Sequence, residues 1–229
     1  MREIVLDTET TGLDPSQGHR VIEIGCLELQ DRRATPATFH AYINPQRDVP
    51  EEARRISNLS TEFLQDKPLF ANVADAFLEF IGESPLVIHN AEFDLKFLNA
   101  ELSRLKKPLI GAARATDTVL IARKKFPGSP ASLDALCRRF NISLDERKSK
   151  GHGAMLDVEL LAQVYVELLG GRQQGLELVA KSSAELGSVL QRVAADKRSV
   201  PLLSRLTDEE KARHDSLVNG LGAQAIWKN

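Results

Sequence analysis

Cysteine, tryptophan and long apolar runs are scarce in this sequence. Its 229 residues include two cysteines, one tryptophan and two tyrosines. Cys26 and Cys137 are far apart in apolar surroundings, which favours two buried thiols over a disulfide, and no cysteine–histidine cluster indicates zinc. No apolar stretch approaches the roughly 18 residues that a membrane span needs. The first residues also lack the order of a signal peptide, so we expect a cytoplasmic protein with no membrane contact.

An excess of positive charge is missing as well. The net charge is −2 and the pI is about 6.2, whereas a stand-alone DNA-binding domain usually carries a basic patch. A function on nucleic acid would therefore require few phosphate contacts, bound metal cations, or a partner that holds the nucleic acid. The length fits one domain with an appendage.

Apolar periodicity predicts strands and helices as far as residue 170. Hairpin-like strands come first and strands then alternate with helices, which predicts an α/β fold with a mixed sheet flanked by helices. The segment 45–58 is expected to be a loop with a short helix. Strands are predicted at 3–7, 21–29, 38–43 and 86–88, and helices at 70–81, 95–105, 131–140 and 154–169.

The pattern changes after Gly170 and Gly171. We therefore divide the chain into a domain at 1–170, a linker at 171–206, and a helix with a tail at 207–229. Thr207 and Glu210 have the spacing of a capping box, which predicts that a helix begins there.

Asp7 and Glu9 follow a buried apolar run and lie two residues apart. Side chains alternate along a strand, so both carboxylates are expected on one face. Two anions this close repel each other unless a cation such as Mg²⁺ lies between them. If this pair is considered alone, a solvated acidic turn after an edge strand is the favoured interpretation.

Two further positions could carry chemistry at the start of helices. Asp94 is expected in the first turn of a helix that Asn90 caps, where an acidic residue is also favourable without any function. His152 lies in a glycine-rich approach and Asp157 in the first turn of the next helix. An imidazole beside metal-bound water accepts protons near neutral pH, although a lone histidine in a glycine-rich loop is more often a surface residue.

Taken together, three motifs in order resemble those of the DEDDh family of 3′–5′ exonucleases. They are residues 7–12 (DTETTG), 89–94 (HNAEFD) and 152–157 (HGAMLD), and 132–137 (SLDALC) is also similar to the family. The resemblance covers about residues 2–170 and is strongest to the proofreading subunits of bacterial replicative DNA polymerases. It implies a ribonuclease H-like fold.

The resemblance also implies a role for each residue at the site, with two Mg²⁺ or Mn²⁺ ions bound. Asp7 would bridge both ions, Glu9 and Asp157 would complete the first metal site, and Asp94 would support the second. His152 would take the proton from the attacking water. Asp7, Glu9 and Asp157 would also contact the substrate, which is the 3′ end of DNA.

Two more substrate contacts are implied by the segment after the third strand. Glu52 matches a substrate-contacting glutamate of the family. Ser57 stands where the family usually has a histidine, and it cannot supply an imidazole. We therefore expect a changed contact with the terminal nucleotide and an intact metal site.

Three interpretations remain open. The protein could be a proofreading subunit, a free-standing exonuclease that trims RNA or repair intermediates, or a scaffold that keeps the fold without catalysis. The complete set of four carboxylates and a histidine disfavours the scaffold. The motifs do not distinguish DNA from RNA, but a C-terminal tail favours the proofreading subunit.

The C-terminal part offers two partner-binding segments. Gln173, Leu176 and Leu178 resemble a peptide that binds a sliding clamp. The motif is degenerate, and an ordinary polar linker could have the same sequence pattern. Ile226 and Trp227 lie near the end of the chain, where we expect them to dock on the polymerase catalytic subunit. A small accessory subunit is a further expected partner.

Overall fold

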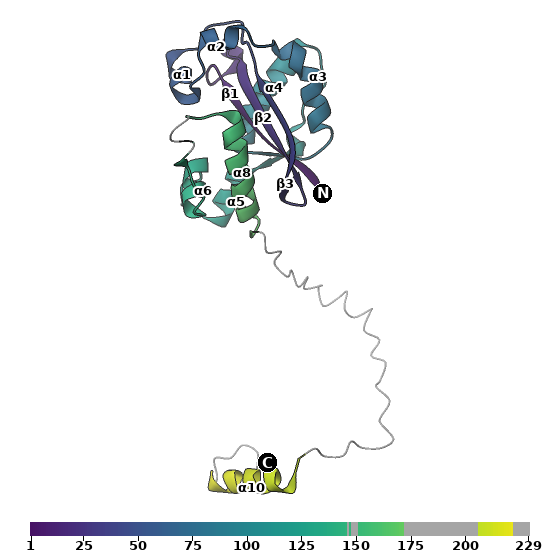
Figure 1. Cartoon of the computed structure of the whole chain (residues 1–229), viewed down its shortest axis with the longest axis vertical. Coiled ribbons are helices and arrows are strands. Elements are labelled where there is room, and N and C mark those ends of the chain that lie inside the picture. The colour runs from purple at the N-terminus through teal and green to yellow at the C-terminus, as the bar shows by residue number, and fades with distance from the viewer. Residues whose placement is uncertain (146, 148–150, 172–205, 222–229) are drawn as a thin grey trace, which may run out of the picture. The chain divides into compact units, whose positions relative to one another are not determined.

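The structure is a computed structural model that describes residues 1–145, 147, 151–171 and 206–221 (Figure 1). It divides into two compact units, Met1–Leu176 and Glu177–Asn229. Within the described residues, no helix is long and apolar enough to cross a membrane. The two units are considered separately.

The first unit contains a five-stranded mixed sheet. Its strands are β1 (Arg2–Thr10), β2 (Val21–Gln30), β3 (Arg33–Tyr42), β4 (Leu86–Ile88) and β5 (Ala115–Asp117). The order across the sheet is β3-β2-β1-β4-β5. The pairs β1–β2 and β2–β3 are antiparallel, whereas β1–β4 and β4–β5 are parallel. This is the predicted mixed sheet, and β1 lies at its centre.

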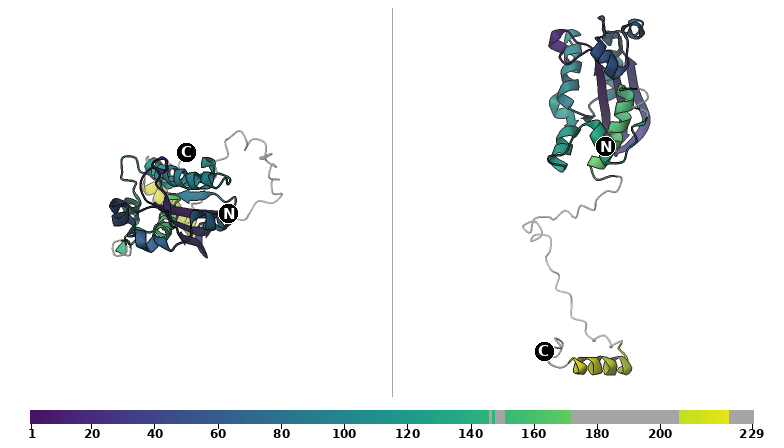
Figure 2. Two further views of the ribbon diagram at one scale, coloured as in Figure 1. Left: turned by 90° about the horizontal axis from the view of Figure 1, so that it is seen from above. Right: turned by 90° about the vertical axis from the view of Figure 1, so that its left-hand side faces the viewer.

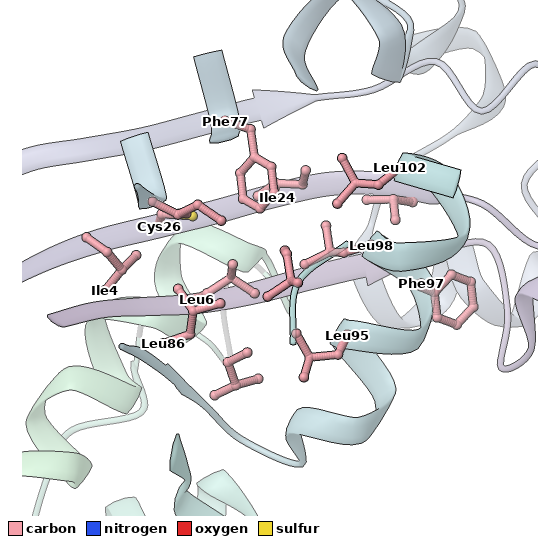
Figure 3. Close-up of a cluster of buried hydrophobic side chains, with 14 of the residues drawn as sticks. Ile4, Leu6, Ile24, Cys26, Phe77, Leu86, Leu95, Phe97, Leu98 and Leu102 are labelled. Atoms are coloured by element: carbon pink, nitrogen blue, oxygen red, sulfur yellow. The ribbon is translucent and has the colours of Figure 1, made fainter. Parts of the chain in front are cut away.

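Alternation along β1 separates two apolar clusters, one on each face of the sheet. Ile4 and Leu6 belong to the cluster that includes side chains of α3 (Phe70–Ile81) and α4 (Ala91–Arg104). Figure 3 shows this cluster, in which helical leucine and phenylalanine side chains pack onto the strands. Val5, which points the other way, belongs to the second cluster. A single strand therefore supports both layers of the domain.

Three helices cover the other face. They are α5 (Thr118–Lys125), α6 (Leu133–Arg139) and α8 (Ala154–Leu168), and the right-hand view of Figure 2 shows helices on both sides of the strands. The two cysteines lie in different clusters, and both are buried free thiols as predicted.

Short elements complete the first unit, and the second unit has one described helix. The helix α10 (Asp208–Gly220) begins with the predicted capping box, because Thr207 accepts from the Glu210 N–H and the Glu210 side chain accepts from the Thr207 N–H. The short elements are η1 (Pro15–Gln17), α1 (Glu51–Ser57), α2 (Thr61–Gln65) and η2 (Ala112–Arg114).

Most predicted elements are present, with some differences in extent. β3 begins at Arg33 rather than at residue 38, because its exposed first half still pairs with the end of β2. The elements α2, β5 and α5 were not predicted from the sequence. Each is short and carries no apolar repeat that could be recognised from its own residues.

Gly25 on β2 allows the start of α8 to approach the sheet closely. A Cβ at this position would lie 2.6 Å from the Ala154 carbonyl carbon and 2.8 Å from the Met155 nitrogen. Both are backbone atoms of a helix packed on the sheet, so they could move only if the helix moved. Gly25 pairs with Asp7, which places this close approach beside the acidic end of β1.

We expect Gly25→Ala to lower both stability and activity. Overpacking of this kind costs about 1–3 kcal/mol of unfolding free energy, and displacement of α8 would also move the residues at its start. Thermal unfolding and a nuclease assay measure the two effects. Gly111→Ala is the matched control, because no atom lies within 4 Å of the added Cβ. Equal Tm values and equal nuclease activities for the two variants would contradict the prediction.

Candidate active site

β1 ends in two acidic side chains on the face of the sheet that α8 covers. Asp7 and Glu9 alternate in phase with Val5, which packs in the α8 cluster. In the β1–β2 ladder, Asp7 is opposite Gly25, where α8 approaches. The predicted shared orientation of the two carboxylates is therefore confirmed.

Asp94 reaches the same strand from α4 and is buried, with 3% of its surface exposed. Its Oδ1 accepts from the Thr8 backbone N–H at 3.0 Å and from the Thr8 hydroxyl at 2.7 Å. Thr8 lies between Asp7 and Glu9, so this pair of hydrogen bonds fixes the α4 carboxylate beside both β1 carboxylates.

The start of α4 differs from the prediction in one respect. Asn90 occupies the N-cap position in a left-handed conformation (φ 68°), and its side chain makes no capping hydrogen bond. The expectation that Asn90 caps α4 was wrong, because an N-cap side chain needs extended backbone to reach the helix N–H groups. Asp117 supplies the cap instead: its carboxylate accepts from the Asn90 and Ala91 N–H groups, each at 3.2 Å. It also accepts from Val119 at 2.8 Å and so caps α5.

His152 and Asp157 lie on either side of the start of α8. The helix begins at Ala154 with Gly153 as N-cap, so Asp157 is in the first turn and His152 precedes the helix, as predicted. Asp157 is buried, and its Oδ2 lies 3.5 Å from His152 Nδ1. The His152 N–H donates to the Ile56 carbonyl oxygen at 3.2 Å, which ties this loop to the end of α1.

Arg147 connects these groups, and its role was not predicted. Its Nη2 donates to Asp157 Oδ2 at 2.6 Å and to His152 Nδ1 at 2.7 Å. Its Nη1 pairs with Asp134 on α6. A guanidinium thus partly offsets the charge of Asp157. Arg147 lies in a segment without apolar periodicity, and no sequence signal distinguished it from an exposed basic residue.

Three of the carboxylates, Asp7, Glu9 and Asp94, have raised pKa values in the protein alone. Burial, with repulsion from Asp94, Glu9 and Asp157, raises the pKa of Asp7 well above its usual value. Burial and then the neighbouring Asp157 raise the pKa of Glu9 to about 8. Burial also raises the pKa of Asp94 to about 7, against the opposing hydrogen bonds from Thr8. A nearby cation would reverse this tendency.

The donor set fits a divalent metal ion. Glu9, His152 and Asp157 each offer a ligand atom, and these atoms lie within 4.8 Å of one another. Asp157 Oδ1 is buried and has no hydrogen-bond partner, so one oxygen of this group has an unused lone pair. Carboxylate oxygens are the ligands that Mg²⁺ and similar hard ions prefer.

The two further substrate contacts occupy α1. Glu52 is exposed in its first turn. Ser57 is buried at its end, where its hydroxyl donates to the Ala53 carbonyl oxygen at 3.0 Å and accepts from the Leu59 N–H at 3.3 Å. The Ser57 hydroxyl is thus engaged with the backbone of its own turn. Its contact with substrate stays a prediction.

The predicted partner-binding residues lie in parts of the chain that the structure does not describe. Gln173, Leu176 and Leu178 lie outside the described residues, and so do Ile226 and Trp227. Their contacts with a clamp or a polymerase stay predictions.

The raised pKa values predict how the stability of the metal-free protein depends on pH. Glu9 and Asp94 shift from 4.5 and 3.8 to about 8 and about 7 on folding, so their protonated forms stabilise the fold. This contribution is complete below the unfolded-state values and is lost as the pH rises through the folded-state values. We therefore expect the Tm of the metal-free protein to fall between about pH 5 and about pH 8.5.

Added Mn²⁺ should raise Tm more at the higher pH, because the ion binds only deprotonated carboxylates. Differential scanning calorimetry of wild type and Glu9→Gln provides the comparison, and the variant should show a shallower decline. A metal effect that did not depend on pH would count against this electrostatic description.

Comparison with known proteins agrees with the arrangement of carboxylates at the candidate active site. The model of the family described as "Exonuclease" matches residues 4–165. The DNA polymerase III subunit epsilon of Rickettsia conorii is 50% identical, with 96% of each chain covered. The Escherichia coli protein of the same name is 40% identical, with 99% of this chain and 97% of that protein covered.

Solved structures show the same fold. Exonuclease X in complex with 5′ overhanging duplex DNA has a TM-score of 0.59 and 23% identity, covering 73% of this chain and 90% of that chain. The nuclease domain of 3′hExo, a DEDDh family member bound to rAMP, has a TM-score of 0.61 and 17% identity, covering 73% and 91%. The predicted ribonuclease H-like fold is confirmed. The chain therefore belongs to the exonuclease family, together with the epsilon subunits of bacterial DNA polymerase III.

Proposed function

We propose that this exonuclease is the proofreading subunit of a bacterial replicative DNA polymerase, which removes nucleotides one at a time from the 3′ end of DNA. One observation carries the proposal: four carboxylates from β1, α4 and α8 converge beside His152. The epsilon subunits that resemble the chain over nearly its whole length support the polymerase assignment.

The carboxylates would hold two divalent ions, Mg²⁺ or Mn²⁺. Asp7, at the centre of the site, would contact both ions. Glu9 and Asp157 would complete the first site, and Asp94 would support the second. Two such ions, when bound, supply an activated water and stabilise the leaving 3′ oxygen. Their positive charge also compensates for an acidic chain in contact with a phosphate backbone.

His152 is proposed to take the proton from the attacking water. Arginine can only donate hydrogen bonds, so His152 Nδ1 accepts from Arg147 in this arrangement and Nε2 carries the hydrogen. For Nδ1 to accept a proton, Arg147 has to withdraw. The scissile phosphate would offer its guanidinium an alternative partner.

The segments beyond residue 171 are proposed to bind partners in the bacterial cytoplasm. Ile226 and Trp227 would anchor the chain on the polymerase catalytic subunit, and Gln173, Leu176 and Leu178 would contact a sliding clamp. Similarity to the epsilon subunits covers 96% to 99% of the chain and therefore extends into this region. A partner that grips the duplex would let a mildly acidic nuclease work at high effective concentration. A small accessory subunit is a further proposed partner.

Frayed or mismatched 3′ ends should be degraded faster than paired ends. The terminal nucleotides have to leave the duplex to reach the carboxylates, and unpairing costs a few kcal/mol, less at a mismatch. We expect at least about a tenfold difference in rate, which corresponds to 1.4 kcal/mol. The measurement is single-turnover digestion of matched and mismatched primer–template DNA, with short RNA as a third substrate.

Two variants control this experiment. Asp7→Asn should abolish digestion of every substrate while the protein stays folded, because it removes the shared ligand and one repelling charge. His152→Ala should lower all rates by about 10²–10⁴-fold and leave the mismatch preference unchanged. Equal rates on paired and mismatched ends, or faster digestion of RNA, would favour the free-standing trimming enzyme instead.

Removal of the C-terminal segments should separate catalysis from partner binding. A chain cut after Gly171 retains every described element of the first unit, since α8 ends at Leu168. It should digest short single strands at the wild-type rate and no longer co-purify with the polymerase catalytic subunit. Unchanged affinity for the polymerase would show that the anchor lies within the nuclease domain.

A further inference from the structure

The helix that carries Asp157 begins without a cap from its own sequence. Its N-cap residue is Gly153, which has no side chain to accept from the first N–H groups of the helix. The Ala154 N–H donates instead to Glu23 Oε2 at 3.1 Å. Glu23 lies on β2, 131 residues earlier in the chain, so the cap comes from the sheet.

Glu23 is itself held at both oxygens. Only 2% of its surface is exposed, and a carboxylate buried this deeply requires partners. One oxygen accepts from Ala154, and Oε1 lies 2.7 Å from His40 Nε2 on β3. Because a carboxylate only accepts, Nε2 must carry the hydrogen in this contact.

The position of Glu23 connects this cap to the active site. Glu23 is directly opposite Glu9 in the β1–β2 ladder, and it holds the helix that brings Asp157 toward Glu9. His152 is two residues before Ala154, so the same hydrogen bond restrains the loop that carries it. Gly25, on the same strand, lets α8 approach, and Glu23 then fixes where the helix starts.

We propose that Glu23, oriented by His40, is a positioning residue for the exonuclease reaction, which sets the placement of Asp157 and His152 relative to Glu9. The inference rests on the proposed function of these three residues. His40 and Ala154 each contact one Glu23 oxygen, and in this proposal Glu23 acts by placing the helix and not by binding a metal or the substrate. A displacement of about 1 Å at a catalytic group can cost roughly 10²-fold in rate.

Glu3 provides a matched control at the other end of the same helix. It is also a buried carboxylate beneath α8, and its Oε1 accepts from the Tyr165 hydroxyl at 2.7 Å. Glu3→Ala and Glu23→Ala each remove one buried carboxylate and one hydrogen bond to α8. Only the second change lies at the end that carries the catalytic groups.

The experiment compares kcat, KM and Mn²⁺ affinity with amide hydrogen exchange at Ala154. Glu23→Ala should lower kcat by about 10–100-fold, with KM within about twofold, weaken Mn²⁺ binding and expose the Ala154 amide to exchange. Glu3→Ala should lower Tm without these effects. Glu23→Gln should recover most of kcat, because its amide oxygen still accepts from Ala154 and neutral His40 can change tautomer.

The contribution of His40 to the orientation of Glu23 is tested separately. His40→Gln, which can still donate to Glu23, should retain more activity than His40→Ala. The proposal is overturned if Glu23→Ala and Glu3→Ala lose activity equally, or if the Ala154 amide stays protected in Glu23→Ala. If wild type digests no nucleic acid, the proposed function fails on its own, whereas the exchange data still decide whether Glu23 caps α8.

Discussion

Mutual repulsion among buried carboxylates is the constraint on which this structure depends. Asp7 and Glu9 on β1 are brought close to Asp94 and Asp157. Burial is the first cause of the raised pKa values of Asp7, Glu9 and Asp94, and repulsion from the neighbouring site carboxylates adds to it for Asp7 and Glu9. Hydrophobic packing on both faces of the sheet holds the four groups together against that repulsion. Stability is thus given up locally at the place where a cation is needed.

Hydrogen bonds from distant parts of the chain hold the four carboxylates in place. The two helices that deliver Asp94 and Asp157 both lack a side-chain cap of their own. Asp117 supplies the cap for the first helix and Glu23 for the second. Thr8 adds two bonds that join Asp94 to the strand. The geometry of the site is therefore set by tertiary contacts as much as by the motifs that contain its carboxylates.

The sequence alone predicted the parts of the site that depend on local rules. Strand alternation gave the common face of Asp7 and Glu9, and helix-start signals placed Asp157 in a first turn and His152 before it. Local rules did not predict features that depend on residues far away in the sequence. Asn90 looked like a cap but has left-handed backbone, and the contacts of Arg147 depend on α6 and α8 coming together. The short strand β5 has no apolar run and exists through its pairing with β4.

The two apolar clusters lie on opposite faces of the sheet, and this placement determines when the four carboxylates can come together. Asp94 comes from the layer on one face and Asp157 from the layer on the other, and both approach Asp7 at the end of β1. If either layer opens or has not yet folded, its carboxylate leaves the group. All four carboxylates therefore come together only in a chain in which both layers are folded.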